Sequence, residues 1–389
     1  MADLATGYRP QSPERIIPLE GLRGLAAIIV FLCHWMLGFK PELMGVAPVF
    51  SMDQSINGRL WAFLVNGRGA VVFFFVLSGF VLSRAAFIKN RPEQIAKAVI
   101  KRWPRLALPT LIATTISWSL AHLNLYYYQQ AGTITQSSWL KNFGSDYPHD
   151  PTGHSLWSAF IQGVYLTFIR GSCYYDTAIW TMHFEFVASF VIFGLCLLLP
   201  LYRNASPWLV IVPLTIAMFL LNEASIWYPP FLVGLLAAYI LPERLKLNTI
   251  CRWAIVAISL YFLGCQEKIG VYEIFAKINY QYIDSIGAFL LISVCYDINL
   301  SPGISRIAKF LGALSFPFYL LHLLVICSFG AWSYLWLEKH HIHSPSSIAG
   351  ILAFLITVLL SLPFIAVNQK WTRLINIKIS SLFTRAFPL

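Results

Sequence analysis

The sequence predicts an all-α, polytopic membrane protein with about ten transmembrane helices, or 11 if residues 154–170 also span the membrane, and with both termini in the cytoplasm. The first observation is composition: 58% of the 389 residues are hydrophobic and only 12% are charged, against about 25% charged residues in an average soluble protein. The second is the recurrence of apolar runs of about twenty residues, the length needed to cross a bilayer. The third is that basic residues gather in the short segments between these runs, a pattern that sets membrane topology.

Ten apolar segments account for the predicted helices. They lie at residues 20–38, 69–88, 106–124, 178–200, 208–222, 229–242, 252–266, 280–297, 311–336 and 347–367. Prolines stand at the joins between them, as expected where helices begin or end. These prolines are Pro200, Pro207, Pro213, Pro229, Pro230, Pro242 and Pro302.

The charges between the spans predict the orientation. If the N-terminal segment 1–18 is cytoplasmic, 20 of the 28 Lys and Arg residues fall on the cytoplasmic side. This imbalance predicts a cytoplasmic N-terminus and C-terminus with an even number of spans. Residues 125–177 then form a long external loop. Its segment 154–170 is apolar, but an additional span there would invert the charge pattern downstream, so we expect an interfacial or re-entrant helix.

Several function classes are excluded or disfavoured. The basic residues are explained by topology and form no stripe interleaved with aromatics, so no nucleic-acid partner is expected. The seven cysteines have no CxxC or zinc-like spacing, and no metal site is expected. The polar N-terminus lacks a signal-peptide pattern, so the first span is expected to be retained. The whole chain, residues 1–389, is expected to be one transmembrane domain.

The first predicted span, "LEGLRGLAAIIVFLCHW", carries two ionisable residues, Arg23 and His34. Such groups are costly inside a membrane and are therefore candidates for function. Their spacing separates them by about 20° around a helix and by about 16 Å along it, so they share one face. The alternatives are an Arg23 that reaches to the lipid headgroups and a neutral His34 bonded to a neighbouring helix.

A third ionisable group, Glu185, lies in "IWTMHFEF" near the start of the fourth span. Thr181 and Glu185 are four residues apart, so they face the same way on a helix. An unpaired carboxylate is expensive at this depth. Glu185 is therefore either part of a site or a structural hydrogen-bonding partner.

A polar stripe runs down the ninth span in "LSFPFYLLHLLV". Ser315, Tyr319 and His322 recur at the spacing of one helix face. A stripe of this kind either lines a site or joins helices by hydrogen bonds.

A cluster of basic residues precedes the third span in "KAVIKRWPRLALP". Arg102 and Arg105 project to nearly one side of a helix, and paired guanidinium groups suit phosphate. Ordinary topology control would also produce such a cluster.

In this order, these motifs resemble the acyltransferase-3 family of integral membrane O-acyltransferases, over essentially the whole chain. The resemblance rests on the Arg-x10-His of the first span, "RGAVVFFFVLSGFVLSR", the Arg-x-x-Arg of "KRWPRLALP", "IWTMHFEF" and the Tyr-x-x-His of "LSFPFYLLHLLVI". Trp180, Thr181 and Met182 replace the commoner Trp-Ser-Leu form, which bears on the acceptor more than on the reaction. An appended hydrolase-like domain, found in some members, is not expected here.

The resemblance implies transfer of an acyl group, most often acetyl from acetyl-CoA, to a sugar hydroxyl of a glycan or polysaccharide, a glycolipid or a small glycoside. It implies that His34 is the catalytic histidine and that Arg23, Arg102 and Arg105 bind acyl-CoA. Acetyl-CoA is then a co-substrate, and no bound cofactor is expected. We expect a multi-pass protein of a bacterial plasma membrane.

The expected mechanism uses His34 as general base, because imidazole titrates near neutral pH. Glu185 would orient or stabilise that imidazole, and His322 is the rival base. Supporting or substrate-binding roles are expected for Trp180, Thr181, Ser315, Tyr319 and His322. The alternative function is a proton-coupled transporter or flippase for a glycan or lipid, in which the same groups relay protons. The lack of an internal repeat argues against that alternative.

Overall fold

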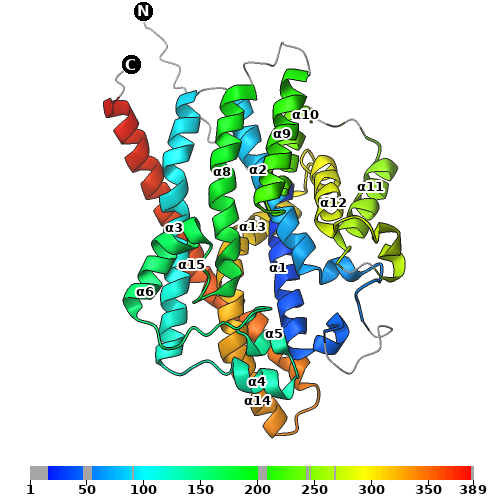
Figure 1. Cartoon of the computed structure of the whole chain (residues 1–389), viewed down its shortest axis with the longest axis vertical. Coiled ribbons are helices and arrows are strands. Elements are labelled where there is room, and N and C mark those ends of the chain that lie inside the picture. The colour runs from blue at the N-terminus through cyan, green and yellow to red at the C-terminus, as the bar shows by residue number, and fades with distance from the viewer. Residues whose placement is uncertain are drawn as a thin grey trace, which may run out of the picture.

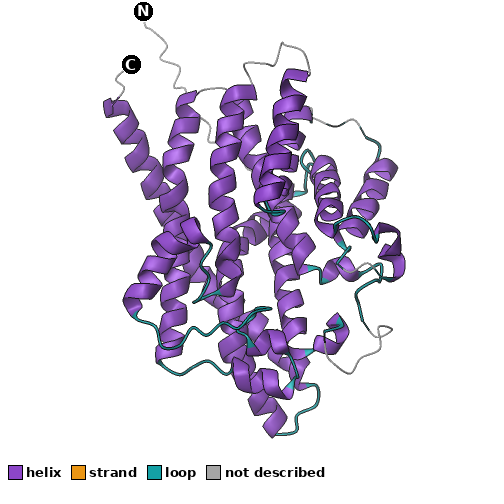
Figure 2. Ribbon diagram, in the orientation of Figure 1, coloured by secondary structure: helices purple, strands orange, loops and turns teal. Residues whose placement is uncertain are grey.

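The computed structural model describes residues 16–46, 55–89, 92–199, 208–241, 245, 247–266 and 269–386, and this part of the chain is helical, without a β-strand (Figure 1, Figure 2). Its long helices are α1 (Ile17–Phe39), α2 (Gly67–Lys89), α3 (Pro92–His122), α8 (Thr181–Leu198), α9 (Trp208–Ala224), α10 (Pro229–Ile240), α11 (Thr249–Leu263), α12 (Tyr280–Cys295), α13 (Pro302–Val325) and α15 (Pro345–Ala386). Each predicted range overlaps one of these helices, which confirms the all-α class.

Three helices extend beyond their predicted ranges. α3 begins at Pro92, so the basic cluster lies inside the helix rather than before it. α13 begins at Pro302 and continues through a π-helical turn, Ile326–Gly330, into α14 (Ala331–Lys339). α15 continues to Ala386. Hydropathy marks only the apolar part of a helix, whereas Lys, Arg and Gln continue a helix readily beyond the membrane.

The described residues contain five helices long and apolar enough to cross a membrane: Ile17–Phe39, Gly67–Phe87, Thr177–Leu198, Pro302–Lys339 and Pro345–Phe383. Four shorter apolar helices, of 10–17 residues, lie between the third and fourth of these. The chain is therefore a multi-pass membrane protein, while the number of spans and their orientation stay predictions. Of the residues used to predict topology, Arg9, Arg15, Arg91, Pro200, Arg203, Pro207, Pro242, Arg244 and Lys246 lie outside the described residues.

Helices α1 and α13 pack closely because glycines stand at their contact. A Cβ on Gly24 would lie 2.5 Å from the Cβ of Leu311 and 2.7 Å from its carbonyl oxygen. A Cβ on Gly312 would lie 2.4 Å from Oε2 of Glu20. Small residues are the usual means by which membrane helices approach closely. As a result, longer side chains elsewhere on α1 and α13 meet directly.

The two ends of the molecule differ. The start of α3 and the end of α15 lie at one end, and the short helices α4 (Tyr128–Ile134) and α5 (Ser138–Lys141) lie with α14 at the other (Figure 1). We call residues 126–178 the cap. The hydroxyl of Ser137 accepts a hydrogen bond from the Leu140 amide, which starts α5, and donates to the backbone oxygen of Leu37 at 2.6 Å. The cap is thereby tied to the end of α1.

The segment expected to be interfacial or re-entrant is helical from Leu156 to Arg170. It comprises α6 (Leu156–Ile161), a π-helical turn (Gln162–Leu166) and α7 (Thr167–Arg170). Its length of about 22 Å is less than the roughly 30 Å of a hydrocarbon core. It packs along α3, where Thr114 donates to the backbone oxygen of Ala159 at 3.0 Å and Trp103 donates to that of Val164 at 2.9 Å.

Candidate active site

His34 of α1 and His322 of α13 form a hydrogen-bonded pair. Nδ1 of His34 lies 2.8 Å from Nε2 of His322, and the two rings are tilted by only 15°. Nδ1 of His322 lies 2.6 Å from the backbone oxygen of Tyr319. His322 is completely buried, whereas His34 keeps part of its surface exposed. The structure thus joins the predicted catalytic histidine to the residue predicted as its rival.

These contacts assign the protons of two neutral imidazoles. A carbonyl oxygen only accepts, so Nδ1 of His322 carries a hydrogen and donates it to Tyr319. Nε2 of His322 is then an acceptor, and Nδ1 of His34 donates to it. The remaining nitrogen, Nε2 of His34, carries a lone pair. The partly exposed histidine is therefore the one that can accept a proton from a substrate.

The cap covers His34. Trp139 of α5, only 8% exposed, has its ring centroid 4.9 Å from that of His34. Nearby, Gly144 adopts a φ of +72°, and a Cβ there would lie 2.5 Å from Cδ1 of Leu323 on α13. Glycine adopts this backbone conformation without strain, which favours a close turn over α13 at this position. Sequence reasoning missed Trp139, because no local pattern relates a loop tryptophan to a residue in a distant span.

Arg23 lies at the contact between α1 and α13. Its Nε donates to Oγ of Ser315 at 2.9 Å, and its Nη2 donates to the backbone oxygen of Gly312 at 2.6 Å. Nη2 also forms an ion pair with Glu20 at 2.8 Å. The guanidinium and Ser315 therefore join the two helices that carry the histidine pair.

Tyr319 and Thr181 join α13 to α8. The Tyr319 hydroxyl lies 2.9 Å from the backbone oxygen of Ala178, to which it donates, and 3.1 Å from Oγ1 of Thr181. All three residues are buried. The polar stripe predicted on α13 thus contacts α1 through its first and last members and α8 through Tyr319.

Glu185 does not hold His34, and the expectation that it orients this imidazole is wrong. Its carboxylate forms an ion pair with Arg102 of α3 and accepts a hydrogen bond from Ser78 of α2 at 2.9 Å. The Arg102 and Glu185 side chains are 10% and 17% exposed. A carboxylate this poorly hydrated requires a cation beside it, and the sequence does not reveal which helix supplies that cation.

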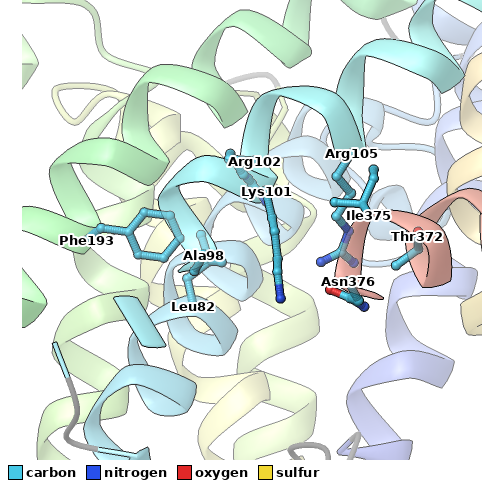
Figure 3. Close-up of a pocket in the computed structure, with 9 residues that line it drawn as sticks. All are labelled: Leu82, Ala98, Lys101, Arg102, Arg105, Phe193, Thr372, Ile375 and Asn376. Atoms are coloured by element: carbon cyan, nitrogen blue, oxygen red, sulfur yellow. The ribbon is translucent and has the colours of Figure 1, made fainter. Parts of the chain in front are cut away.

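A cavity of about 120 Å³ lies beside this ion pair, between α2, α3, α8 and α15 (Figure 3). Its lining contains three cationic side chains and no carboxylate in the described part of the chain. The lining residues are Leu82, Ala98, Lys101, Arg102, Arg105, Phe193, Thr372, Ile375 and Asn376. The cavity therefore suits an anionic group.

Arg102 and Arg105, the two arginines predicted on the third span, both line this cavity, but their side chains point in different directions. Lys101 and Arg105 extend to the same side of α3, with Arg105 near Asn376, whereas Arg102 turns toward α8 (Figure 3). Arg23, the third residue predicted to bind acyl-CoA, is not among the lining residues. Thr372 and Asn376 were missed, because α15 extends past the apolar stretch that marked it in the sequence.

Trp180 belongs to an aromatic cluster. Its ring lies 4.8 Å from Trp227, 5.6 Å from Phe184 and 6.4 Å from Phe75, measured between centroids. These contacts fasten the start of α8 to α2. The supporting or substrate-binding role expected for Trp180 stays a prediction.

Asp176 is a fully buried carboxyl that sequence reasoning missed. Its Oδ1 accepts from the Ala178 amide at 3.0 Å, and its Oδ2 has no hydrogen-bond partner among the described residues. Burial raises the pKa of Asp176 to about 8, so the carboxyl is mostly protonated at neutral pH. The only sequence signal is that of a helix cap, because aspartate commonly precedes a helix.

Residues 16–366 match the acyltransferase domain of the acyltransferase-3 family. Acyltransferase clz18 of Cochliobolus lunatus is 22% identical over an alignment of 412 positions, gaps included, which covers 85% of this chain and 87% of that protein. Acyltransferase MdmB of Streptomyces mycarofaciens is 33% identical over 117 residues, 30% of this chain and 28% of that protein. No solved structure matches the chain. The matched range contains both histidines and the basic residues of α3.

Proposed function

This chain belongs to the acyltransferase-3 family of membrane acyltransferases, and from that premise we propose that it transfers an acetyl group from acetyl-CoA to a hydroxyl of a carbohydrate-containing acceptor. The acceptor is a glycan, a glycolipid or a glycoside. The observation that carries the proposal is the pairing of His34 with His322. A hydroxyl is a weak nucleophile at neutral pH, and this pairing leaves a lone pair on the accessible imidazole.

The cavity beside Arg102 supports a donor site. CoA carries several phosphate charges, and guanidinium and ammonium groups bind phosphate by charge-assisted hydrogen bonds. Lys101 and Arg105 supply that charge, and Asn376 and Thr372 supply neutral hydrogen-bonding groups. Glu185 neutralises part of the positive charge of Arg102. The ion pair joins α3 to α8 next to the cavity.

The proposed chemistry is direct transfer with one base. Nε2 of His34 takes the proton from the acceptor hydroxyl as that oxygen attacks the thioester carbonyl. The carbon–sulfur bond breaks, and the CoA thiolate takes the same proton from the imidazolium. An ester and free CoA are the products, so no other reactant is needed.

His322 supports this chemistry as a positioning residue. It is completely buried and cannot reach a substrate directly. Its bond to Tyr319 presents Nε2 as an acceptor, which fixes the tautomer and ring orientation of His34. The role assigned to aspartate in serine hydrolases is here taken by a neutral histidine.

The experiment that tests this function uses purified protein in detergent with radiolabelled acetyl-CoA and an extract of cells that lack the gene. Mass spectrometry of the labelled products should show an acetyl-sized increase on a carbohydrate-containing molecule. His34→Ala protein of normal yield and monodispersity should lose this product. A wild-type rate in that variant removes His34 from the base role, and movement of a glycan without acylation supports transport instead.

A further inference from the structure

A second cavity lies in the cap, at the opposite end of the molecule from the start of α3 (Figure 1). Its volume is about 160 Å³, and three consecutive tyrosines, Tyr126 to Tyr128, form one wall. Gln130 and Asp150 are among the residues that complete the lining. Among the described residues, the lining contains one carboxylate and no cationic side chain, whereas the cavity beside Arg102 is lined by cationic side chains and no carboxylate. The occupant of the cap cavity is therefore not a phosphate.

Several polar groups in this cavity have no partner in the described part of the protein. Thr152 donates to Oδ1 of Asp150 through both its amide, at 2.9 Å, and its hydroxyl, at 2.7 Å. The Tyr128 hydroxyl also approaches Oδ1, at 3.5 Å. Oδ2 of Asp150, the Gln130 amide and the Tyr127 hydroxyl bond to no other described residue. They offer both donors and acceptors beside aromatic rings, which suits a neutral molecule bearing several hydroxyl groups.

The tyrosine wall of the cavity contacts the continuation of the helix that carries His322. The Tyr127 amide donates to the backbone oxygen of Cys327 at 3.1 Å. Cys327 follows His322 by five residues, which is about 7.5 Å along a helix axis. Tyr126 packs on Phe143 with ring centroids 5.0 Å apart, and its hydroxyl lies 2.8 Å from Ser117. The wall of the cavity thus packs on the π-helical turn that follows α13, one to two helical turns beyond His322.

We propose that this cavity, formed by Tyr126–Gln130, Asp150 and Thr152, is the acceptor subsite and binds a neutral polyhydroxylated part of the acceptor, such as one sugar ring. The proposal rests on the proposed function. The Tyr127 ring packs against the face of the sugar ring, and Gln130 and Asp150 bond its hydroxyl groups. The donor and the acceptor then approach the histidine pair from opposite ends of the molecule.

The test measures acetyl transfer by the purified full-length protein to methyl glycosides of glucose, galactose, mannose, rhamnose and N-acetylglucosamine, with 1-decanol as the alternative alcohol. The variants are Tyr127→Leu and Gln130→Ala. Tyr147→Leu is the matched control, because Tyr147 is 75% exposed in the same cap and does not line the cavity. Hydrolysis of acetyl-CoA without an acceptor is measured for every variant.

The expected result is acetylation of at least one glycoside, with a KM for it raised about tenfold or more by either cavity variant. The KM for acetyl-CoA and the hydrolysis rate should stay within about twofold, as should all values for Tyr147→Leu. If a glycoside is acetylated but its KM is unchanged in Tyr127→Leu and Gln130→Ala, the proposed subsite is wrong and the proposed function is unaffected. If the wild-type protein acetylates none of the glycosides, the proposed class of ligand for this cavity is wrong. If the wild-type protein transfers acetyl neither to these alcohols nor to any molecule of the cell extract, the proposed function is wrong, and the proposed subsite is wrong with it.

Discussion

Nδ1 of His34 lies 2.8 Å from Nε2 of His322, and this contact joins residues 288 positions apart in the sequence. The buried His322 is oriented by the backbone oxygen of Tyr319, and the partly exposed His34 retains a lone pair on Nε2. The two histidines are therefore not equivalent. One is suited to take a proton, and the other is suited to hold the first in place.

This inequality predicts different consequences for the two histidines. His322→Ala should lower kcat about 100-fold, because His34 loses the acceptor that fixes its tautomer. His322→Gln should recover part of the rate, since its amide oxygen can accept from Nδ1 of His34. The KM for acetyl-CoA should change little in either variant. Equal loss of kcat in the glutamine and alanine variants would contradict a positioning role.

The basic cavity predicts a selective defect in donor binding. Arg105→Ala should raise the KM for acetyl-CoA about tenfold or more, because a charge-assisted contact to phosphate is lost. S-acetylpantetheine, which lacks these phosphates, should show no change in KM. Lys97→Ala is the control, since Lys97 lies on the same helix but pairs with Glu93 and does not line the cavity. If the KM rises equally for acetyl-CoA and for S-acetylpantetheine, Arg105 does not bind the phosphates.

The sequence predicted the helices because hydropathy and length are local properties. Each of the ten predicted segments overlaps a helix, whereas the polar extensions of α3, α13 and α15 and the short helices α4 and α5 were missed. The shared face of Arg23 and His34 also follows from local geometry, and α13 contacts both residues.

Pairings between helices could not be predicted in the same way. The stripe of Ser315, Tyr319 and His322 was visible, but nothing in it says that α1 and α8 are its neighbours. Glu185 was assigned to His34 for the same reason, although Arg102 is its partner. Trp139 was missed altogether. Its position depends on how the cap folds back over α1, which is a long-range property.

The ion pair between Arg102 and Glu185 predicts non-additive effects on stability. Arg102→Met should destabilise the protein by roughly 3 kcal/mol, because a poorly hydrated carboxylate is left without a cation. Adding Glu185→Gln should restore part of that loss, since the unpaired charge is removed. The stability of both variants is measured by thermal denaturation, with the remaining folded protein quantified by size-exclusion chromatography. A double variant no more stable than Arg102→Met would contradict the pairing.

Asp176 predicts a pH dependence of stability. Its pKa is about 8 in the folded protein and about 3.9 in an unfolded chain. Between these values the folded form binds a proton that the unfolded form releases, so stability falls as pH rises from about 4 to about 8. Asp176→Asn removes this loss, and its melting temperature should exceed that of the wild type by a few degrees at pH 8 and by less at pH 5. Asp146→Asn, at an exposed cap position, should show no such trend, and an identical trend in both variants would exclude Asp176 as its source.

The close contact of α1 and α13 predicts that one methyl group at Gly24 will impair catalysis. Alanine normally favours a helix over glycine by up to about 1 kcal/mol. At Gly24, however, the added Cβ would meet the Cβ and carbonyl oxygen of Leu311, and such overpacking costs about 1–3 kcal/mol. Relief requires α1 and α13 to separate, which lengthens the contact between His34 and His322. Gly24→Ala should therefore lower both the melting temperature and kcat, the latter about tenfold. Gly194→Ala is the matched control, because a Cβ at that helical position meets nothing within 4 Å. A Gly24→Ala enzyme with wild-type kcat would show that catalysis does not depend on the spacing of these two helices.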